Sequence, residues 1–211
     1  MTSPLTRLAS SHGASAVAVV GIGCRFPGAT GPQQLWELMM QGRDVISEVP
    51  RSRFDVDKVY SPEPAVPGRI SSRWGGFIDG VDLFDASFFG ISPREALRMD
   101  PQQRMLLETS YAACEDAGLT LDMLAGSRSG VFIGQVASNY WDLQSREGIL
   151  DIYSTVGSAA RSVLSGRISY AFDLRGPSLS VDTACSSSLV AVHLAMSSLR
   201  SGEADLALAG G

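Results

Sequence analysis

The chain has 211 residues, of which 45% are hydrophobic and 18% are charged, and its formal net charge is −5. This balance is typical of a globular chain with a hydrophobic core and excludes an extended disordered protein. Because the net charge is negative and Lys and Arg form no run, we expect no nucleic acid among the partners.

The start of the chain is polar and rich in Ser and Ala over residues 1–15, and we expect it to be a disordered tail. An apolar run over residues 16–22 follows. It is far too short to cross a bilayer, so the sequence predicts no membrane span.

The apolar pattern after the tail alternates between strands and helices, which predicts a largely parallel sheet with helices on its faces. Two helix starts are marked by a polar cap followed by proline, at Ser92-Pro93 and at Asp100-Pro101. Gly118 is the expected end of the second of these helices. The other predicted elements are a buried strand over 16–22, a helix over 33–41, a long Pro- and Gly-rich connection over 42–90, a strand over 130–136, a helix over 157–172, a strand over 178–184, a helix over 186–200 and a strand over 204–209.

Three cysteines, Cys24, Cys114 and Cys185, lie far apart and form no CxxC pair. Their odd number, together with the lack of a secretory signal, argues against a disulfide framework and against a structural zinc site. We therefore expect no metal, and a cytoplasmic location.

Cys185 lies where a predicted strand ends and a predicted helix begins. A thiol at a helix N-terminus faces unpaired backbone N–H groups and the positive end of the helix dipole. Both favour the thiolate, which is the nucleophilic form. A small buried core residue is the ordinary alternative for a free cysteine. The position alone leaves both interpretations open.

The residues around Cys185 carry a family resemblance. The segment over 176–195, which contains Val-Asp-Thr-Ala-Cys-Ser-Ser-Ser, resembles the active-site signature of β-ketoacyl synthases, above all the ketosynthase domains of modular type I polyketide synthases. Four further stretches resemble the same family in order and spacing, over 19–28, 73–79, 84–96 and 99–108. On this resemblance, residues 16–211 are identified as the N-terminal part of a ketosynthase domain, truncated at its end.

The resemblance implies a fold and a set of partners. The family has an α/β thiolase-like fold, an αβαβα layered sandwich of two similar halves, and this chain would be the first half only. The strand before Cys185 would pair across the two-fold axis of a homodimer. An acyl carrier protein domain and the remaining synthase domains would be the other partners.

The resemblance also implies the chemistry. Cys185 would take an acyl group from the phosphopantetheine thioester of a carrier protein, and its backbone N–H would contribute to the oxyanion hole. The acyl enzyme would then undergo decarboxylative Claisen condensation with a malonyl-type extender, which makes the family acyltransferases. No cofactor is expected to bind the chain directly.

Two histidines assist condensation in the family, and both come from the second half of the fold. The only histidines here are His12, in the expected tail, and His193. His193 follows Cys185 by eight residues, about 12 Å along the helix at ~1.5 Å per residue, so it is out of reach and is interpreted as a packed core residue. We therefore expect that the chain alone does not condense.

We also expect half a fold to expose one face of its sheet and to be poorly soluble or dependent on a partner.

Two other interpretations stay open. One is a non-catalytic fragment that serves dimerisation or carrier binding, and the other is a fragment of a stand-alone fatty-acid condensing enzyme. The long connection over 42–90 and the motif over 100–104 favour the modular synthases over the second of these.

Asp182 is interpreted as structural, because strand alternation would point it away from Cys185. Asn139-Tyr140 stands where the family commonly has Asp-Tyr, in a loop that borders the acyl pocket of relatives.

Overall fold

The computed structural model describes residues 16–211, which form two compact units. One unit contains residues 16–22 and Asp82–Gly211, and the other contains Gly23–Val81. The expected tail over residues 1–15, with His12, lies outside the described residues.

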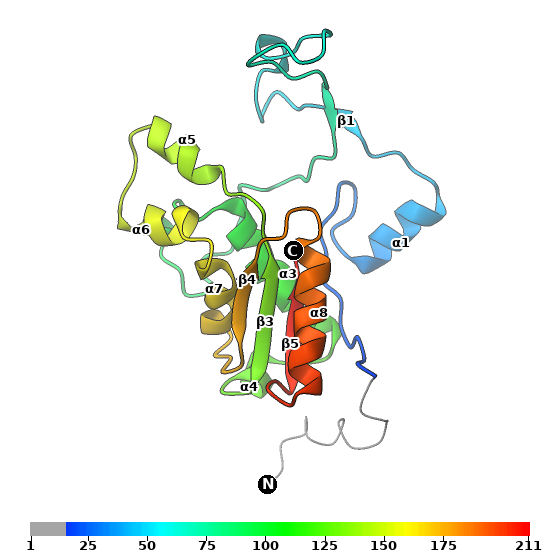
Figure 1. The fold of residues 1–211 in the computed structure, drawn as a ribbon, viewed down its shortest axis with the longest axis vertical. Coiled ribbons are helices and arrows are strands. Elements are labelled where there is room, and N and C mark those ends of the chain that lie inside the picture. Colours follow the sequence, from blue (N-terminus) through cyan, green and yellow to red (C-terminus); the bar gives the residue numbers. More distant parts are fainter. Residues whose placement is uncertain (1–15) are drawn as a thin grey trace. The chain divides into compact units, whose positions relative to one another are not determined.

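A three-stranded parallel sheet forms the centre of the larger unit (Figure 1). Strand β3 (Ser129–Gly134) lies between β4 (Ser178–Val181) and β5 (Leu206–Gly210). Helix α7 (Val163–Ala171) leads into β4, and α8 (Ser187–Arg200) joins β4 to β5. The parallel order predicted from the alternation of strands and helices is therefore confirmed.

Side chains of β3 alternate between two hydrophobic clusters. Val131 and Ile133 pack with residues of α3 (Pro101–Asp116) and α7 on one face of the sheet. Phe132 points to the other face and packs against Ala191 and Ala195 of α8. All residues of β3 except Gly134 are buried.

Helices of this chain lie on both faces of the sheet, so neither face is wholly exposed. The prediction of an exposed face is confirmed only in part: on the face that carries Phe132, its register partner Leu179 is 41% exposed. Apolar side chains are also exposed on the outer side of α8, where Leu189 is 75% exposed. Whether the isolated chain is poorly soluble stays a prediction.

The remaining elements are short. In the larger unit they are α2 (Pro93–Ala96), α4 (Leu121–Leu124), α5 (Tyr140–Arg146), α6 (Ile152–Ser154) and a π-helical turn, η3 (Thr155–Ala159). In the smaller unit they are α1 (Pro32–Met40), β1 (Ser47–Glu48), η2 (Val56–Lys58) and β2 (Trp74–Gly75), with β1 and β2 paired antiparallel. The long Pro- and Gly-rich connection corresponds largely to the smaller unit.

Both predicted helix starts are confirmed. The Ser92 side chain accepts a hydrogen bond from the backbone N–H of Glu95 at 3.2 Å, which begins α2. The Asp100 carboxylate accepts one from the backbone N–H of Gln102 at 2.9 Å, which begins α3. Gly118, with φ of +68°, adopts the left-handed conformation just after α3.

The strand predicted over residues 16–22 is wrong. These residues are extended, but among the described residues they pair with no strand, and Val19 is 81% exposed. They lie against the end of α3 instead. The backbone N–H of Ile22 donates to Asp116, and a Cβ at Gly21 would lie 2.2 Å from the carbonyl oxygen of Ala113. An apolar run does not reveal whether a partner strand is available.

The helix predicted over residues 157–172 is interrupted. The π-helical turn η3 ends at Ala159, and Ala160 is extended before α7 begins at Val163. The carbonyl oxygen of Gly157 accepts the backbone N–H of Asp100 at 2.8 Å, and that of Ser158 accepts the Ser138 hydroxyl at 2.8 Å. Tertiary hydrogen bonds thus take carbonyl groups that a continuous helix would use.

Asp100 connects two parts of this arrangement, because it is 3% exposed, begins α3 and lies 2.5 Å from the Ser138 hydroxyl, whose single proton is shared between the Asp100 carboxylate and the Ser158 carbonyl oxygen. We predict that Asp100→Ala lowers the free energy of unfolding by about 1–2 kcal/mol, since it removes a helix cap and one of the two acceptors beside the partly buried Ser138 hydroxyl. Urea denaturation measures this loss. Asp100→Asn keeps one capping oxygen and should lose less. Equal stability of Asp100→Ala and wild type would contradict the prediction.

Candidate active site

Cys185 lies in the turn between β4, which ends at Val181, and α8, which begins at Ser187. Its neighbour Ala184 has φ of +55°, a left-handed conformation that is costly for a residue with a side chain. Cys185 itself is exposed. Among the described residues nothing buries the thiol, as a small core residue would require, and its role as a nucleophile stays a prediction.

Hydroxyl groups hold the turn in place. The Ser187 hydroxyl accepts the backbone N–H of Thr183 at 2.9 Å and donates to the carbonyl oxygen of Ala184 at 2.6 Å. The Ser186 hydroxyl donates to the carbonyl oxygen of Thr183 at 2.8 Å. Two hydroxyls that follow the cysteine in the sequence thus hydrogen-bond the backbone that precedes it.

Asp182 has a structural role, as the sequence predicted. One carboxylate oxygen accepts the backbone N–H of Ala184 at 3.1 Å, and the other pairs with Arg161 at 2.9 Å. Arg161 also donates to the carbonyl oxygen of Val136 at 3.0 Å, which ties the turn to the loop after β3. The expected alternation does not extend to Asp182, because β4 ends one residue earlier.

Gly134 allows the first turn of α8 to lie directly against the end of β3. A Cβ at Gly134 would lie 2.6 Å from the carbonyl carbon of Ser187 and 2.7 Å from the nitrogen of Ser188. A Cβ at Gly211, after β5, would lie 2.2 Å from the carbonyl oxygen of Gly134. Sequence reasoning did not single out Gly134, although a glycine at the end of a buried strand is a sign of close backbone approach.

An open hollow of about 330 Å³ lies beside Cys185 at the carboxyl ends of the strands. In open α/β sheets this edge is where ligands bind. Among the described residues, no acceptor is hydrogen-bonded to the backbone N–H of Cys185. The lining residues are Gln102, Gly134, Gln135, Val136, Ala137, Ala184, Cys185, Ser187, Ser188 and Gly211. Asn139 and Tyr140 do not belong to this lining, whereas the start of their loop does.

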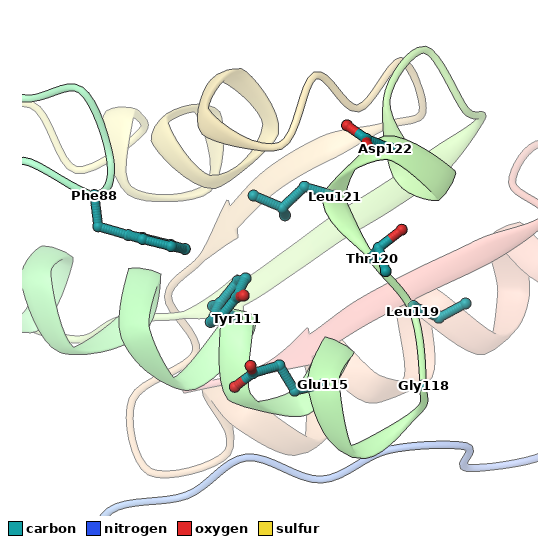
Figure 2. Close-up of a pocket in the computed structure, with 8 residues that line it drawn as sticks. All are labelled: Phe88, Tyr111, Glu115, Gly118, Leu119, Thr120, Leu121 and Asp122. Atoms are coloured by element: carbon teal, nitrogen blue, oxygen red, sulfur yellow. The ribbon is translucent and has the colours of Figure 1, made fainter.

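A larger hollow of about 470 Å³ lies between α3 and α4 (Figure 2). The rings of Phe88 and Tyr111 meet there edge to face, with centroids 4.8 Å apart. Burial and the carboxylate of Glu115 raise the pKa of Tyr111. Its lining contains neither a cysteine nor a histidine. The smaller hollow, which holds the exposed thiol, is therefore the candidate active site.

The other two cysteines differ from Cys185 in their surroundings. Cys114 is 2% exposed within the core, and burial raises the pKa of its thiol to about 11. Burial also raises the pKa of the Cys24 thiol, which is half-buried. Neither site favours the thiolate.

His193 is exposed on α8, so its interpretation as a packed core residue is wrong. It lies on the outer side of the helix with Leu189 and Val192, and the described residues leave this side uncovered. Helical spacing alone does not tell which side of a helix is covered.

Within residues 16–211, no group of three or more His, Cys, Asp or Glu side chains could hold a metal ion. None of the helices in that range is long and apolar enough to cross a membrane.

Comparisons with known proteins agree with the resemblance of the sequence. Residues 14–211 match the family model of the β-ketoacyl synthase N-terminal domain. A phenolphthiocerol/phthiocerol polyketide synthase of Mycobacterium tuberculosis is 54% identical over 200 residues, which cover 94% of this chain and 13% of the relative. Phenolphthiocerol synthesis polyketide synthase type I Pks15/1 of Mycobacterium bovis is 55% identical over 197 residues, which cover 92% of this chain and 9% of the relative.

Solved ketosynthases have the same fold. An oxazolomycin ketosynthase domain of Streptomyces albus matches with a TM-score of 0.83 and 38% identity, over 92% of this chain and 33% of its own. The ketosynthase from module 6 of the Bacillus subtilis bacillaene synthase matches with a TM-score of 0.78 and 36% identity, over 91% and 30%. The chain thus spans about a third of these structures, and the predicted partial thiolase-like fold is confirmed.

The three thiols should differ in reactivity. We predict that iodoacetamide at pH 8 alkylates Cys185 first and leaves Cys114 unmodified, because a thiol with a pKa of about 11 is a thiolate in only about one molecule in a thousand at that pH. Cys114 should react as the pH approaches its pKa or after unfolding in urea. Peptide mass spectrometry gives the order. Modification of Cys114 in the native chain before Cys185 would contradict it.

Two glycines offer a matched pair of substitutions. We predict that Gly134→Ala costs about 1–3 kcal/mol of stability and slows alkylation of Cys185, because its Cβ forces α8 away from β3. Gly166, within α7, has no atom within 4 Å of an added Cβ. Gly166→Ala should therefore add about 0.5–1 kcal/mol. Thermal melts and alkylation rates of both variants test this, and unchanged rates in Gly134→Ala would contradict the role of Gly134.

Proposed function

This chain belongs to the β-ketoacyl synthase family, and on that basis we propose that residues 16–211 act as the N-terminal part of a ketosynthase domain in a modular type I polyketide synthase. The observation that carries the proposal is the exposed thiol of Cys185, held between β4 and α8 beside an open hollow. The thiol is the nucleophile that receives the growing acyl chain.

Acyl loading requires a nucleophile and a place for negative charge. The Cys185 thiol releases its proton to water, and Sγ attacks the carbonyl carbon of a carrier-bound acyl thioester. The backbone N–H of Cys185, free of an acceptor among the described residues, donates to the oxyanion of the tetrahedral intermediate. The carbon–sulfur bond to phosphopantetheine then breaks, and the departing thiolate takes up a proton.

Condensation is the second step and belongs to the complete domain. A malonyl-type extender loses CO₂, the electron pair of the broken bond attacks the acyl carbonyl, and the bond to Sγ of Cys185 breaks. Among the described residues the sole histidine is His193, which lies about 9 Å along α8 from Ser187, the first residue of that helix, at ~1.5 Å per residue, and is exposed. It does not reach the acyl group, so the chain alone loads but does not condense.

Several partners follow from the same proposal. Among the described residues β4 pairs with β3 alone, so its other edge is free to pair with β4 of a second copy in a homodimer. An acyl carrier protein domain supplies the acyl phosphopantetheine, and further synthase domains act on the product. The location is the cytoplasm.

Acyl labelling tests the assignment of the nucleophile. We predict that S-butyryl-N-acetylcysteamine adds one butyryl group to the wild type and to Cys24→Ala, but none to Cys185→Ala, because only Cys185 is exposed. Intact-mass spectrometry measures the addition. A chain that stays unlabelled although it is folded would support the non-catalytic alternative. Equal labelling of Cys185→Ala and wild type would place the nucleophile elsewhere.

A further inference from the structure

Gln135 is the first residue after β3 and lies in the wall of the hollow that contains Cys185. Its backbone N–H donates to the carbonyl oxygen of Val181 at 2.9 Å, which continues the pairing of β3 with β4. This residue is 7% exposed. The sheet therefore fixes the position of its backbone.

The side chain of Gln135 is not satisfied by the protein. Its carbonyl oxygen, Oε1, is buried and has no hydrogen-bond partner among the described residues. Gln102, the other amide of the wall, is held through its nitrogen, because its Nε2 donates to the carbonyl oxygen of Ala137 at 2.9 Å. A buried acceptor without a donor is costly and requires an explanation.

We propose that Gln135 is a substrate-binding residue: its side chain turns toward the hollow, and Oε1, which is buried in the free chain, then accepts a hydrogen bond from an N–H or O–H group of the acyl thioester at Cys185. The proposal rests on the proposed function. A thioester carries such a donor in two places, a hydroxyl on the acyl chain or an amide N–H on the pantetheine arm. In the same wall the side chains of Val136, Ala137 and Ala184 are apolar, and the Ser187 hydroxyl donates to the carbonyl oxygen of Ala184, so none of these four side chains supplies a donor to Gln135.

Four thioesters separate the two sources of the donor. Butyryl and β-hydroxybutyryl groups are each presented on N-acetylcysteamine, which has an amide N–H, and on ethanethiol, which has none. The rate of acylation of Cys185 is measured by mass spectrometry for the wild type, Gln135→Met and Val136→Ala. Gln135→Met keeps the size of the side chain and removes the acceptor, whereas Val136→Ala alters the same wall without touching Gln135.

We expect a donor to speed acylation of the wild type about five- to tenfold, as one neutral hydrogen bond would. Gln135→Met should be acylated by the donor-free thioester as fast as the wild type is, but should gain no speed when the thioester carries a donor. Val136→Ala should still be acylated faster by a thioester that carries a donor. Loss of the hydroxyl advantage identifies the acyl chain as the source, and loss of the N-acetylcysteamine advantage identifies the pantetheine arm. Gln135→Leu replaces Gln135→Met if a thermal melt shows the latter unfolded.

Two results would overturn the role of Gln135 and leave the nucleophile intact. In one, the wild type loads all four thioesters at equal rates. In the other, Gln135→Met is acylated faster by thioesters with a donor than by those without one, by the same factor as the wild type. Failure of the wild type to load any thioester would overturn the proposed function itself, and the role of Gln135 with it.

Discussion

The close approach of three backbone segments at Gly134 is the constraint on which the candidate site depends. The end of β3, the first turn of α8 and the residue after β5 meet there at distances that leave no room for a Cβ. α8 therefore begins directly at the carboxyl edge of the sheet, and the turn before it lies at the rim of the hollow. The Ser187 hydroxyl then binds both Thr183 and Ala184, which fixes the backbone on the N-terminal side of Cys185.

Polar groups near Cys185 fall into two sets. Those of Asp182, Ser186 and Ser187 are engaged in the turn and its contacts with Arg161. Among the described residues, the Gln135 carbonyl and the Cys185 backbone N–H are unengaged. On the proposed function, a hydrogen-bonded turn with an unengaged backbone N–H suits nucleophilic attack on a carbonyl, since that N–H would donate to the oxyanion. On the proposed function, loading uses this turn, whereas condensation uses the complete domain.

Local signals could be predicted from the sequence, and features that depend on distant partners could not. The caps at Ser92 and Asp100 act within one helical turn, and the motif around Cys185 spans a single strand and helix. The strand over 16–22 and the burial of His193 failed because both require a neighbour that apolar spacing does not reveal. The helix over 157–172 failed because Asp100 and Ser138 bind its carbonyl groups. The unsatisfied Gln135 is visible only once the fold has buried it.

A crystal structure of the chain after reaction with a butyryl thioester tests most directly that this turn presents a nucleophile to the hollow. We predict continuous density from Sγ of Cys185 to a butyryl group that lies in the hollow beside Val136 and Ala137, with the carbonyl oxygen within hydrogen-bond distance of the Cys185 backbone N–H. An adduct at another residue, or a butyryl group directed away from the hollow, would contradict it.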